Sequence, residues 1–336
     1  MKAVQVQAPA TAALVEVPDL TRYSGNEVLL RIDLVGMCGT DLTTFRGGNP
    51  MVVFPRILGH EVAATVVEGA QDLPAGTKVT VSPYTSCGTC ASCRRGRHNA
   101  CQNNQTMGVQ RDGAMTEYIT LPRERLYTAN LSSRELCLVE PLTVGAHAAA
   151  RGRVAPEDTV AVFGCGGIGL GAIASAAFRG ATTIAIDMDD RKLEIAGKAG
   201  AAHLINTATQ DLHTRLAEIT TGAGPDVIIE AIGLPLTFRA AVEEVAFTGR
   251  VVYIGYTKEP VAYETRLFVQ KELDILGSRN ALPEDFHAVI RMLESGKFPV
   301  EDAISAVVPP EEAANMLAEW SATPAKFTKI MVQFAD

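Results

Sequence analysis

A glycine-rich segment most strongly limits what this chain can fold into. Residues 159–187 read TVAVFGCGGIGLGAIASAAFRGATTIAID, a β-rich run, then Gly164-x-Gly166-x-x-Gly169, small residues, and a second β-rich run that ends in Asp187. This order predicts a strand, a tight turn, a helix and a strand capped by an acid, which is the dinucleotide-binding βαβ unit. Gly164 is expected to make the turn, Gly166 to let the backbone approach a pyrophosphate, and Gly169 to bring the helix close to the strand.

Residues near this turn also indicate which ligand binds. The N–H groups that begin the helix, at Gly167 and Ile168, would face phosphates, because a helix N-terminus favours negative charge. Asp187 can accept hydrogen bonds from ribose hydroxyls but repels a 2′-phosphate, so NAD is expected and NADP is disfavoured. The alternative is a glycine turn that binds nothing, but the flanking strand, helix and acid favour the cofactor.

Length and charge define the broad class. The 336 residues exceed the size at which one hydrophobic core stops growing, so two domains are expected. An apolar content of 47% and a charged content of 20% are typical of soluble globular proteins. A formal net charge of −8 argues against nucleic acid or anionic membranes as partners. The start of the chain shows no apolar signal region, so we expect a cytoplasmic protein whose cysteines stay reduced.

The pattern of strands and helices divides the chain. Residues 1–143 are mostly short alternating runs between turn residues, which predicts a β-barrel-like domain. Residues 144–275 alternate apolar strands with amphipathic helices, which predicts an α/β domain with a doubly wound parallel sheet. Residues 276–336 are expected to return to the first domain. A strand predicted over residues 250–256 is a candidate edge for pairing two copies of the chain.

Four cysteines form the strongest metal signal. Cys87, Cys90, Cys93 and Cys101 follow the spacing Cys-x2-Cys-x2-Cys-x7-Cys. Four thiolates this close in sequence can close a tetrahedral zinc site without help from the rest of the fold. A closed site leaves no position for substrate, so its expected role is to order a lobe over residues 84–105. Two disulfides are the alternative, which a reducing compartment disfavours.

A second group of candidate ligands is spread along the chain. Cys38, His60, Glu61 and Glu140 supply a thiolate, an imidazole and two carboxylates, a set that suits Zn²⁺ with an open coordination position. Taken singly, Cys38 reads as an inert buried thiol and His60 as a core histidine. Because these residues lie far apart in sequence, spacing alone leaves a catalytic metal site and a structural role equally open.

In order and spacing, these motifs resemble the zinc-dependent medium-chain alcohol dehydrogenases over nearly the whole chain. The segments that carry the resemblance are Cys38-Gly39-Thr40-Asp41, Gly59-His60-Glu61, the four-cysteine lobe, Glu140-Pro141-Leu142 with Gly145-x-His147, and the glycine turn with Asp187. The sequence is most similar to the sorbitol and threonine dehydrogenase branch. Within it, three segments resemble the L-galactonate and L-gulonate 5-dehydrogenases: residues 46–50, 108–113 and 271–275. The resemblance implies a GroES-like catalytic domain, a Rossmann domain, and hydride transfer from a secondary alcohol to NAD.

The resemblance also implies roles for individual residues. Two zinc ions would bind, one in the lobe and one at the dispersed ligands, with Glu61 or Glu140 bound directly or through water. Thr40 would accept the substrate's proton, and Asp41 would support His60. Cofactor contacts would come from the glycine turn and from further residues downstream: Asp187, Lys192, Ile232, Ile254, Ser278 and Arg279.

The proton path and the substrate are less defined. Thr43 stands where some alcohol dehydrogenases carry a histidine five residues past the zinc cysteine, so water near the carboxylates is the expected proton exit. The expected substrate is a small sugar acid of the L-galactonate or L-gulonate type, with a polyol such as sorbitol or galactitol, or L-threonine, as alternatives. Arginines on loops are more often solvated than ligand-binding, but three are candidates for holding a carboxylate: Arg46, Arg111 and Arg279.

Two functions of other kinds use the same fold. One is a catalytically silent regulatory protein that binds zinc and nucleotide, because fold does not fix function. The other is an NADPH-dependent quinone or enoyl reductase, which would not need Cys38, His60 and Glu140. The complete set of ligands favours the dehydrogenase. The family suggests homodimers or homotetramers.

Overall fold

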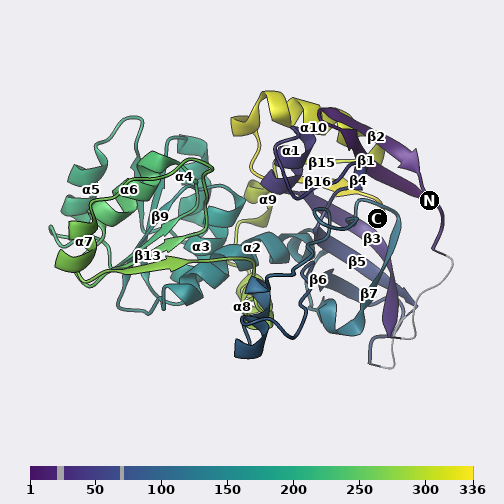
Figure 1. Cartoon of the computed structure of the whole chain (residues 1–336), viewed down its shortest axis with the longest axis horizontal. Coiled ribbons are helices and arrows are strands. Elements are labelled where there is room, and N and C mark those ends of the chain that lie inside the picture. Colours follow the sequence, from purple (N-terminus) through teal and green to yellow (C-terminus); the bar gives the residue numbers. More distant parts are fainter. Residues whose placement is uncertain (21–25, 69–71, 336) are drawn as a thin grey trace. The chain divides into compact units, whose positions relative to one another are not determined.

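The computed structural model describes residues 1–20, 26–68 and 72–335, and the chain forms two compact units (Figure 1). Unit 1 comprises Met1–Glu140 and Val300–Asp336, and unit 2 comprises Pro141–Pro299. The sequence analysis expects domain boundaries at 143/144 and 275/276, whereas the two units meet at 140/141 and 299/300. The reason is that residues 276–299 complete unit 2, where they finish the strand β14 (Asp274–Gly277) and add the helix α8 (Pro283–Glu294), which packs on α3 (Gly167–Phe178).

Unit 1 is mostly β-structure. Its strands are β1 (Lys2–Ala8), β2 (Thr11–Glu16), β3 (Glu27–Met37), β4 (Arg56–Ile57), β5 (Glu61–Glu68), β6 (Lys78–Val81), β7 (Tyr118–Pro122), β8 (Leu126–Thr128), β15 (Ala306–Val308) and β16 (Ile330–Gln333). Its helices are α1 (Gly39–Phe45), the beginning of α2 (Ser133–Arg151), α9 (Val300–Ala303) and α10 (Ala313–Ala322), with short 3₁₀ turns η1 (Cys93–Arg95), η2 (His98–Ala100), η3 (Arg123–Arg125), η4 (Pro310–Glu312) and η5 (Pro324–Lys326).

The long strand β3 organises the main sheet of unit 1. Its strand order is β15-β16-β3-β5-β6-β8, and β7 also pairs with β3. The neighbours of β3 run antiparallel to it, whereas β15 and β16 pair in parallel. The first half of β3 alternates buried and half-buried residues, and its second half is fully buried, as expected for a strand that enters a core. This buried half leads directly to Cys38.

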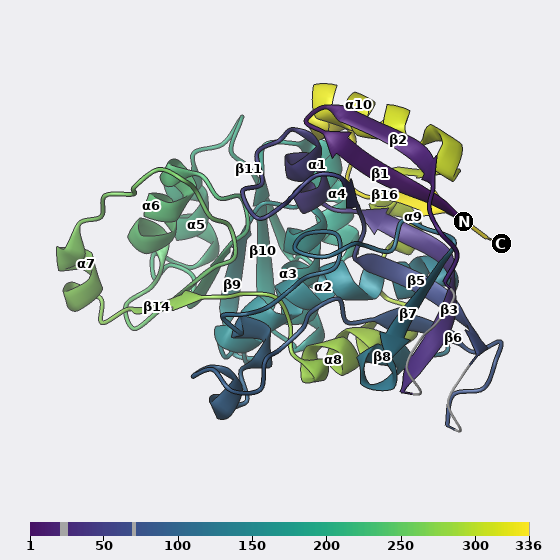
Figure 2. The ribbon, with the colours of Figure 1, turned by 45° about the vertical axis from the view of Figure 1, so that its right-hand side comes forward.

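A smaller sheet and the C-terminal helix cover part of unit 1. The small sheet has the order β2-β1-β4. In Figure 2 the yellow helix α10 lies beside the purple hairpin of β1 and β2, and α10 contacts β2. Trp320 of α10 is buried in the same apolar core as Leu30 and Val62. The C-terminal segment is therefore part of the packing of unit 1.

Unit 2 is an α/β layer structure. Its strands are β9 (Thr159–Phe163), β10 (Thr182–Asp187), β11 (His203–Asn206), β12 (Val227–Glu230), β13 (Arg250–Tyr253) and β14 (Asp274–Gly277). Its helices are the rest of α2, α3 (Gly167–Phe178), α4 (Asp190–Lys198), α5 (Leu212–Ile219), α6 (Pro235–Glu244), α7 (Thr265–Gln270) and α8 (Pro283–Glu294).

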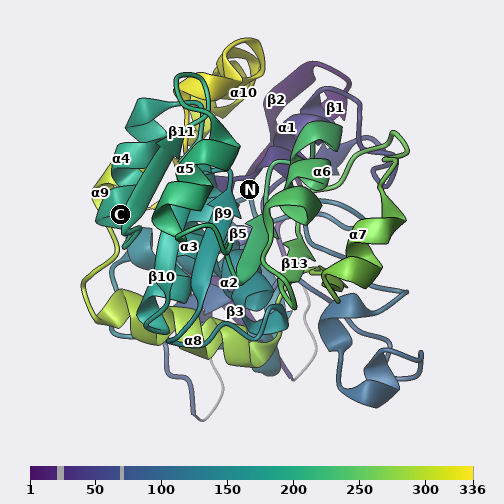
Figure 3. The ribbon, with the colours of Figure 1, turned by 90° about the vertical axis from the view of Figure 1, so that its left-hand side faces the viewer.

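The sheet of unit 2 is parallel throughout, with the order β11-β10-β9-β12-β13-β14 and helices packed along its strands (Figure 3). Apart from one polar end residue each, β9 and β12 are apolar, because both faces of a parallel sheet are buried. The predicted edge strand at residues 250–256 is wrong. β13 pairs with strands on both sides, and β14 takes the edge, since the sheet continues past residue 275.

The sequence analysis assigned no helix to residues 133–151, where the structure has the long helix α2. Pro141 lies inside α2, and a proline in a helix interior normally signals a break. The boundary between the two units falls within this helix, directly after Glu140. Across the described parts of the chain, no helix has both the length and the apolar character needed to cross a bilayer.

Candidate metal centres and cofactor site

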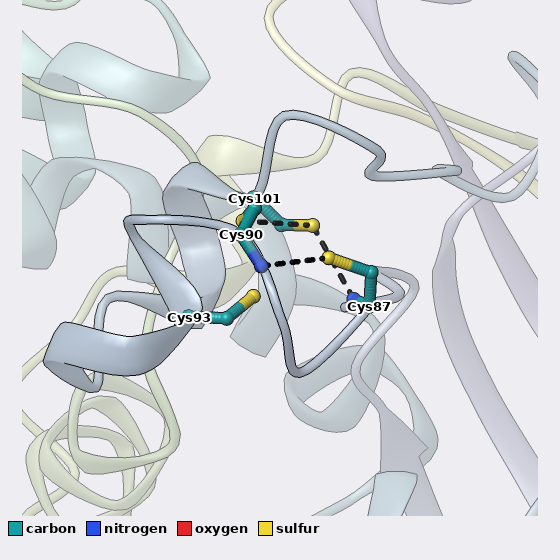
Figure 4. Close-up of side chains that lie close together, drawn as sticks. All are labelled: Cys87, Cys90, Cys93 and Cys101. Carbon is teal, nitrogen blue, oxygen red and sulfur yellow. Dashed lines mark hydrogen bonds between the residues drawn. The ribbon is translucent and has the colours of Figure 1, made fainter.

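The four cysteines of the lobe converge on one point. The sulfur atoms of Cys87, Cys90, Cys93 and Cys101 all lie within 4.8 Å of one another and turn toward a common centre (Figure 4). The Sγ atoms of Cys90 and Cys101 are 3.9 Å apart, far beyond the ~2.05 Å of an S–S bond, so these two are not a disulfide. This geometry fits four thiolates around a tetrahedral metal ion.

Backbone N–H groups donate hydrogen bonds to sulfur atoms of the lobe. The N–H groups of Cys90 and Cys87 donate to Cys87 Sγ at 3.4 Å and Cys101 Sγ at 3.3 Å. The hydroxyl of Ser92 lies 3.1 Å from Cys90 Sγ, and this contact and nearby backbone N–H groups lower the pKa of Cys90 to about 5. Backbone hydrogen bonds likewise lower the pKa of Cys87 to about 7. These contacts favour the thiolate, the form that binds zinc, at Cys87 and Cys90, whereas burial raises the pKa of Cys93 to about 11.

A second cluster brings together residues that are distant in sequence. One ligand atom each of Cys38, His60 and Glu61 lies within 4.8 Å of the other two. Cys38 is the N-cap of α1, and its N–H donates to Asp41 Oδ2 at 2.9 Å, so the helix start fixes the cysteine. Glu61 is the first residue of β5 and pairs with Gly36 of β3. Two neighbouring chain segments thus supply the three ligand atoms.

The carboxylate of Glu61 occupies space that Gly36 leaves free. A Cβ atom at position 36 would lie 2.0 Å from Glu61 Oε2, so a larger residue there would displace the carboxylate. On its other side, both oxygens of Glu61 accept from the ammonium of Lys329 at 2.6 Å. Lys329 is buried, and burial lowers the pKa of its ammonium group, but the charges of Glu61 and Cys38 outweigh this and raise the pKa. Glu61 is therefore held in place as a carboxylate–ammonium pair.

Glu140 lies outside the compact set of ligand atoms. It is buried in α2, and its Oε1 accepts from the hydroxyl of buried Tyr84. Burial raises the pKa of the Glu140 carboxyl, while the positive charge of His60 and the Tyr84 hydrogen bond act against this rise. These electrostatic contacts show that Glu140 borders the cluster, as an outer carboxylate.

His60 carries the clearest sign of a missing partner. Its Nδ1 is buried and has no hydrogen-bond partner among the described residues. Burial lowers the pKa of this imidazole, but the negative charges of Cys38, Asp41 and Glu140 outweigh it and raise the pKa well above its usual value. The negatively charged groups around this imidazole favour the binding of a cation there. The residues present therefore suit a Zn²⁺ ion.

Asp41, which the resemblance places beside His60, interacts with His60 electrostatically. Asp41 is fully buried, and its oxygens accept from the N–H groups of Cys38 and Gly59. Burial raises the pKa of Asp41, and the charge of His60 opposes the rise. Thr40 lies in the first turn of α1 and is half-buried. The hydroxyl of Thr43 donates back to the carbonyl of Gly39 at 2.9 Å, so it faces its own helix.

The glycine turn has the geometry expected of a phosphate-binding loop. Gly164 follows β9 with φ of 96°, a left-handed conformation that glycine adopts without strain. A Cβ at Gly169 would lie 1.8 Å from the carbonyl oxygen of Gly164, so α3 approaches the turn as closely as a glycine allows. Gly166 is the N-cap of α3, with open space where its side chain would be, and Gly167 and Ile168 begin the helix. Their N–H groups are available to an anion.

The predicted cofactor residues share one edge of the sheet in unit 2. Ile232, Ile254 and Ser278 follow the carboxyl ends of β12, β13 and β14, and Asp187 ends β10. Parallel strands bring these ends together, which is where open α/β sheets bind ligands. The hydroxyl of Ser278 is buried without a hydrogen-bond partner among the described residues, and Ile232 is exposed. Arg279 is exposed next to Ser278.

Asp187 is engaged with backbone amides. Its Oδ2 accepts from the N–H of Cys165 in the glycine turn at 2.8 Å, and its Oδ1 accepts from Met188 and Asp189. Lys192 of α4 is half-buried, and its charge reaches Cys165, where it acts against the rise in pKa that burial and Asp187 produce. The structure therefore brings Asp187 and Lys192 together beside the turn.

Comparison with known proteins identifies the family. The zinc-binding dehydrogenase model matches residues 167–295, and the alcohol dehydrogenase GroES-like domain model matches residues 24–130. The L-galactonate-5-dehydrogenase of Escherichia coli K12 is 34% identical over 81% of each chain. The sorbitol dehydrogenase of Bacillus subtilis 168 is 36% identical over 78% of this chain and 76% of that one. The chain belongs to the zinc-type alcohol dehydrogenases.

A solved structure supports the same family. The RspB alcohol dehydrogenase of Escherichia coli CFT073, crystallised with NADH, matches with a TM-score of 0.90 and 28% identity over 99% of each chain. The predicted fold class, a GroES-like domain joined to a parallel-sheet Rossmann domain, is thereby confirmed for this zinc-type alcohol dehydrogenase, as is the predicted resemblance.

Two of the predicted carboxylate-binding arginines have protein partners in this dehydrogenase. Arg46 is the C-cap residue of α1 and donates to the hydroxyl of Ser321, from α10, at 3.0 Å and to its carbonyl at 2.5 Å. Arg111 donates to the carbonyl groups of Pro83 and Gln105 at 3.2 and 3.4 Å. Arg46 therefore joins the end of α1 to α10, and Arg111 joins two loop segments.

Sequence reasoning missed Lys329 and Tyr84, which hold the two carboxylates of the second cluster. Lys329 stands just before the apolar strand β16, and a lysine in an apolar run is a signal for a buried acidic partner. Tyr84 gave no comparable signal, because a tyrosine in a loop is common. His147, part of the resemblance, pairs through Nδ1 with Asp285 Oδ2 at 2.7 Å and belongs to neither metal cluster.

Proposed function

We propose that this chain is an NAD-dependent zinc dehydrogenase that oxidises a secondary alcohol of a polyol or sugar acid to a ketone. The alcohol carbon gives a hydride to NAD, and its hydroxyl gives a proton, so the products are the ketone, NADH and H⁺. The observation that carries the proposal is the cluster of half-buried Cys38 with buried His60 and Glu61, whose ligand atoms lie within 4.8 Å of one another. A thiol, an imidazole and a carboxylate form the donor set of a catalytic zinc site.

In this proposal the two carboxylates have different roles. Glu61 is the carboxylate ligand, which its place in the compact cluster supports, and Glu140 is an outer carboxylate that reaches the metal through water. Zn²⁺ and Lys329 together balance the charges of Cys38, Glu61 and Glu140, while the carboxylate of Asp41 accepts from the backbone N–H groups of Cys38 and Gly59. A buried cluster of this kind is stable only when its charges are matched.

Bound zinc would supply Lewis acidity, which makes the proton of a hydroxyl group easier to remove. The remaining work belongs to side chains. Thr40, near Cys38 in α1, accepts the substrate's proton, and the outer carboxylate Glu140 offers a route for that proton through water. Since Thr43 bonds to its own helix, this route replaces the histidine found in some relatives.

We propose a second zinc ion in the four-cysteine lobe and NAD at the sheet edge of unit 2. The convergence of the four sulfurs supports the first, and the glycine turn beside Asp187 supports the second. Asp187 favours NAD because a 2′-phosphate would place up to two further negative charges beside this carboxylate. Lys192, Ile232, Ile254, Ser278 and Arg279 complete the proposed cofactor contacts.

Two relatives are named as dehydrogenases of L-galactonate and of sorbitol, which supports a substrate of this kind. Arg46 and Arg111 are occupied by protein acceptors, which favours an uncharged polyol over a sugar acid held by these two side chains. This observation therefore favours the polyol, and the sugar acid stays as the other candidate.

Metal analysis and a substrate screen test the proposal. We expect about two zinc ions per chain, and NADH formation with at least one polyol or aldonate, with threonine included as the remaining alternative. A chain that binds one zinc and NAD but oxidises none of these compounds would be a silent relative. Zinc-free protein with full activity would refute the metal role. NADP preferred over NAD would refute the role of Asp187. Light scattering of the same preparation tests for the homodimer or homotetramer that we propose.

A further inference from the structure

Tyr84 connects the four-cysteine lobe of unit 1 with the border of the Cys38 cluster. It lies between the end of β6 and Cys87, the first cysteine of the lobe. Its side chain is 6% exposed, and its hydroxyl donates to Oε1 of Glu140, which is 3% exposed. One residue therefore contacts the border of the Cys38 cluster while its backbone belongs to the lobe.

The lobe holds the residues on both sides of Tyr84. The N–H of Thr85 donates to Asn104 Oδ1 at 3.2 Å, and the N–H of Gln105 donates to Thr85 Oγ1 at 2.7 Å. On the other side, the carbonyl of Pro83 accepts from the N–H of Met107 at 3.1 Å. The N–H of Asn104 donates to the carbonyl of Cys101 at 3.2 Å, so a metal ion that fixes Cys101 also fixes the start of residues 104–107.

The hydrogen bonds of Pro83 and Thr85 limit the directions in which the Tyr84 side chain can point. A tyrosine has two side-chain torsions, so once its backbone and the packing of its ring are fixed, the hydroxyl can reach few positions. A buried carboxylate depends strongly on such a donor, because water does not replace it and hydrogen bonds to charged groups are the stronger ones.

We propose that Tyr84 is a positioning residue that transmits the order of the four-cysteine lobe to Glu140 at the catalytic cluster. The inference rests on the proposed function, since it takes both clusters as zinc sites. Loss of metal from the lobe would release residues 104–107, then Tyr84, and Glu140 would lose its donor. The lobe would thus act on the reaction without supplying any group to it.

The test compares Tyr84→Phe with Tyr127→Phe. Tyr127, on β8, is a second buried tyrosine of unit 1, so its variant removes a hydroxyl elsewhere. Both variants are prepared with Co²⁺ in the Cys38 cluster, whose visible absorption reports the ligand field and does not depend on turnover. In Tyr84→Phe we expect an altered Co²⁺ spectrum and kcat lower by about 10- to 100-fold, the loss of a hydrogen bond to a charged group, with KM for NAD unchanged. Tyr127→Phe should match the wild type.

A second variant tests the link to the lobe. Thr85→Ala removes the oxygen that accepts from Gln105 and leaves Tyr84, Glu140 and all proposed ligands in place. We expect the same change in the Co²⁺ spectrum, smaller in size. An unchanged spectrum and kcat in Tyr84→Phe would overturn the positioning role. A change in Tyr84→Phe but none in Thr85→Ala would overturn the link to the lobe. A wild-type protein without metal at Cys38 would instead remove the proposed function, and this inference with it.

Discussion

The two metal clusters differ in how the chain builds them. The lobe takes its four ligands from residues 87–101, and backbone N–H groups of the same loop bond to the sulfurs. The second cluster combines α1, β5 and residues far along the chain, with Lys329 separated from Glu61 by 268 positions. The first needs only a short loop and a metal, whereas the second needs the complete fold of unit 1.

Their electrostatics differ in the same way. In the lobe, four thiols surround one point, and hydrogen bonds from backbone N–H groups and a hydroxyl lower the pKa of Cys87 and Cys90. In the second cluster, a thiol, an imidazole, three carboxylates and an ammonium are packed together in the interior. A uniform closed site is suited to holding structure, and a mixed buried site with matched charges is suited to chemistry. Three substitutions test this contrast.

Cys38→Ser should produce the largest effect. Loss of the thiolate removes a metal ligand, and Lewis acidity contributes several kcal/mol, so kcat/KM should fall on the order of 10⁴-fold or more. NAD binding, measured by fluorescence quenching, should be unchanged because the glycine turn is in unit 2. The lobe should keep its zinc. Activity within a factor of ten of the wild type would contradict the assignment.

Lys329→Met should have an intermediate effect on stability. It leaves the Glu61 carboxylate buried without its partner, which costs about 3–5 kcal/mol in the free energy of unfolding. Urea denaturation of metal-free protein measures this loss, and added Zn²⁺ should recover part of it, because the cation replaces the ammonium. Lys326→Met is the control, since its exposed pair with Glu319 should contribute less than about 1 kcal/mol. Equal losses in the free energy of unfolding would show that the buried pair contributes no more to stability than the exposed pair.

Cys101→Ser should have the smallest effect on the whole molecule. The lobe should lose its metal and open locally, while the apolar cores of both units stay intact, so tryptic cleavage at Arg94 or Arg95 should speed up on the order of 10-fold. Gel analysis over time measures the rate, and Cys165→Ala, outside both clusters, is the control. Global unfolding at the same denaturant concentration as wild type is expected. A collapse of the whole fold would mean that the lobe is not a local unit.

The same contrast explains what the sequence could predict. The strand predicted to end in Asp187 is found as β10, and the turn and helix at Gly164 are found where the glycines predicted them, because the signals are local. The cysteine spacing predicted a cluster for the same reason. The partners of Glu61 and Glu140 could not be predicted, because antiparallel pairing of β3 with β16 and the path of α2 decide which side chains meet. Nothing in the sequence analysis pointed to α2, whose interior holds Pro141.

The position of Asp187 has a consequence for any redesign of the proposed preference for NAD. An engineer who wishes to admit NADP would replace this acid with a small neutral residue, yet its Oδ2 also binds the amide of Cys165 and so fastens the end of β10 to the neighbouring loop. Glycine or alanine at 187 would remove the repulsion and loosen the loop at once. Asparagine keeps an oxygen acceptor for that amide while losing the negative charge, so it is the replacement that separates the two effects.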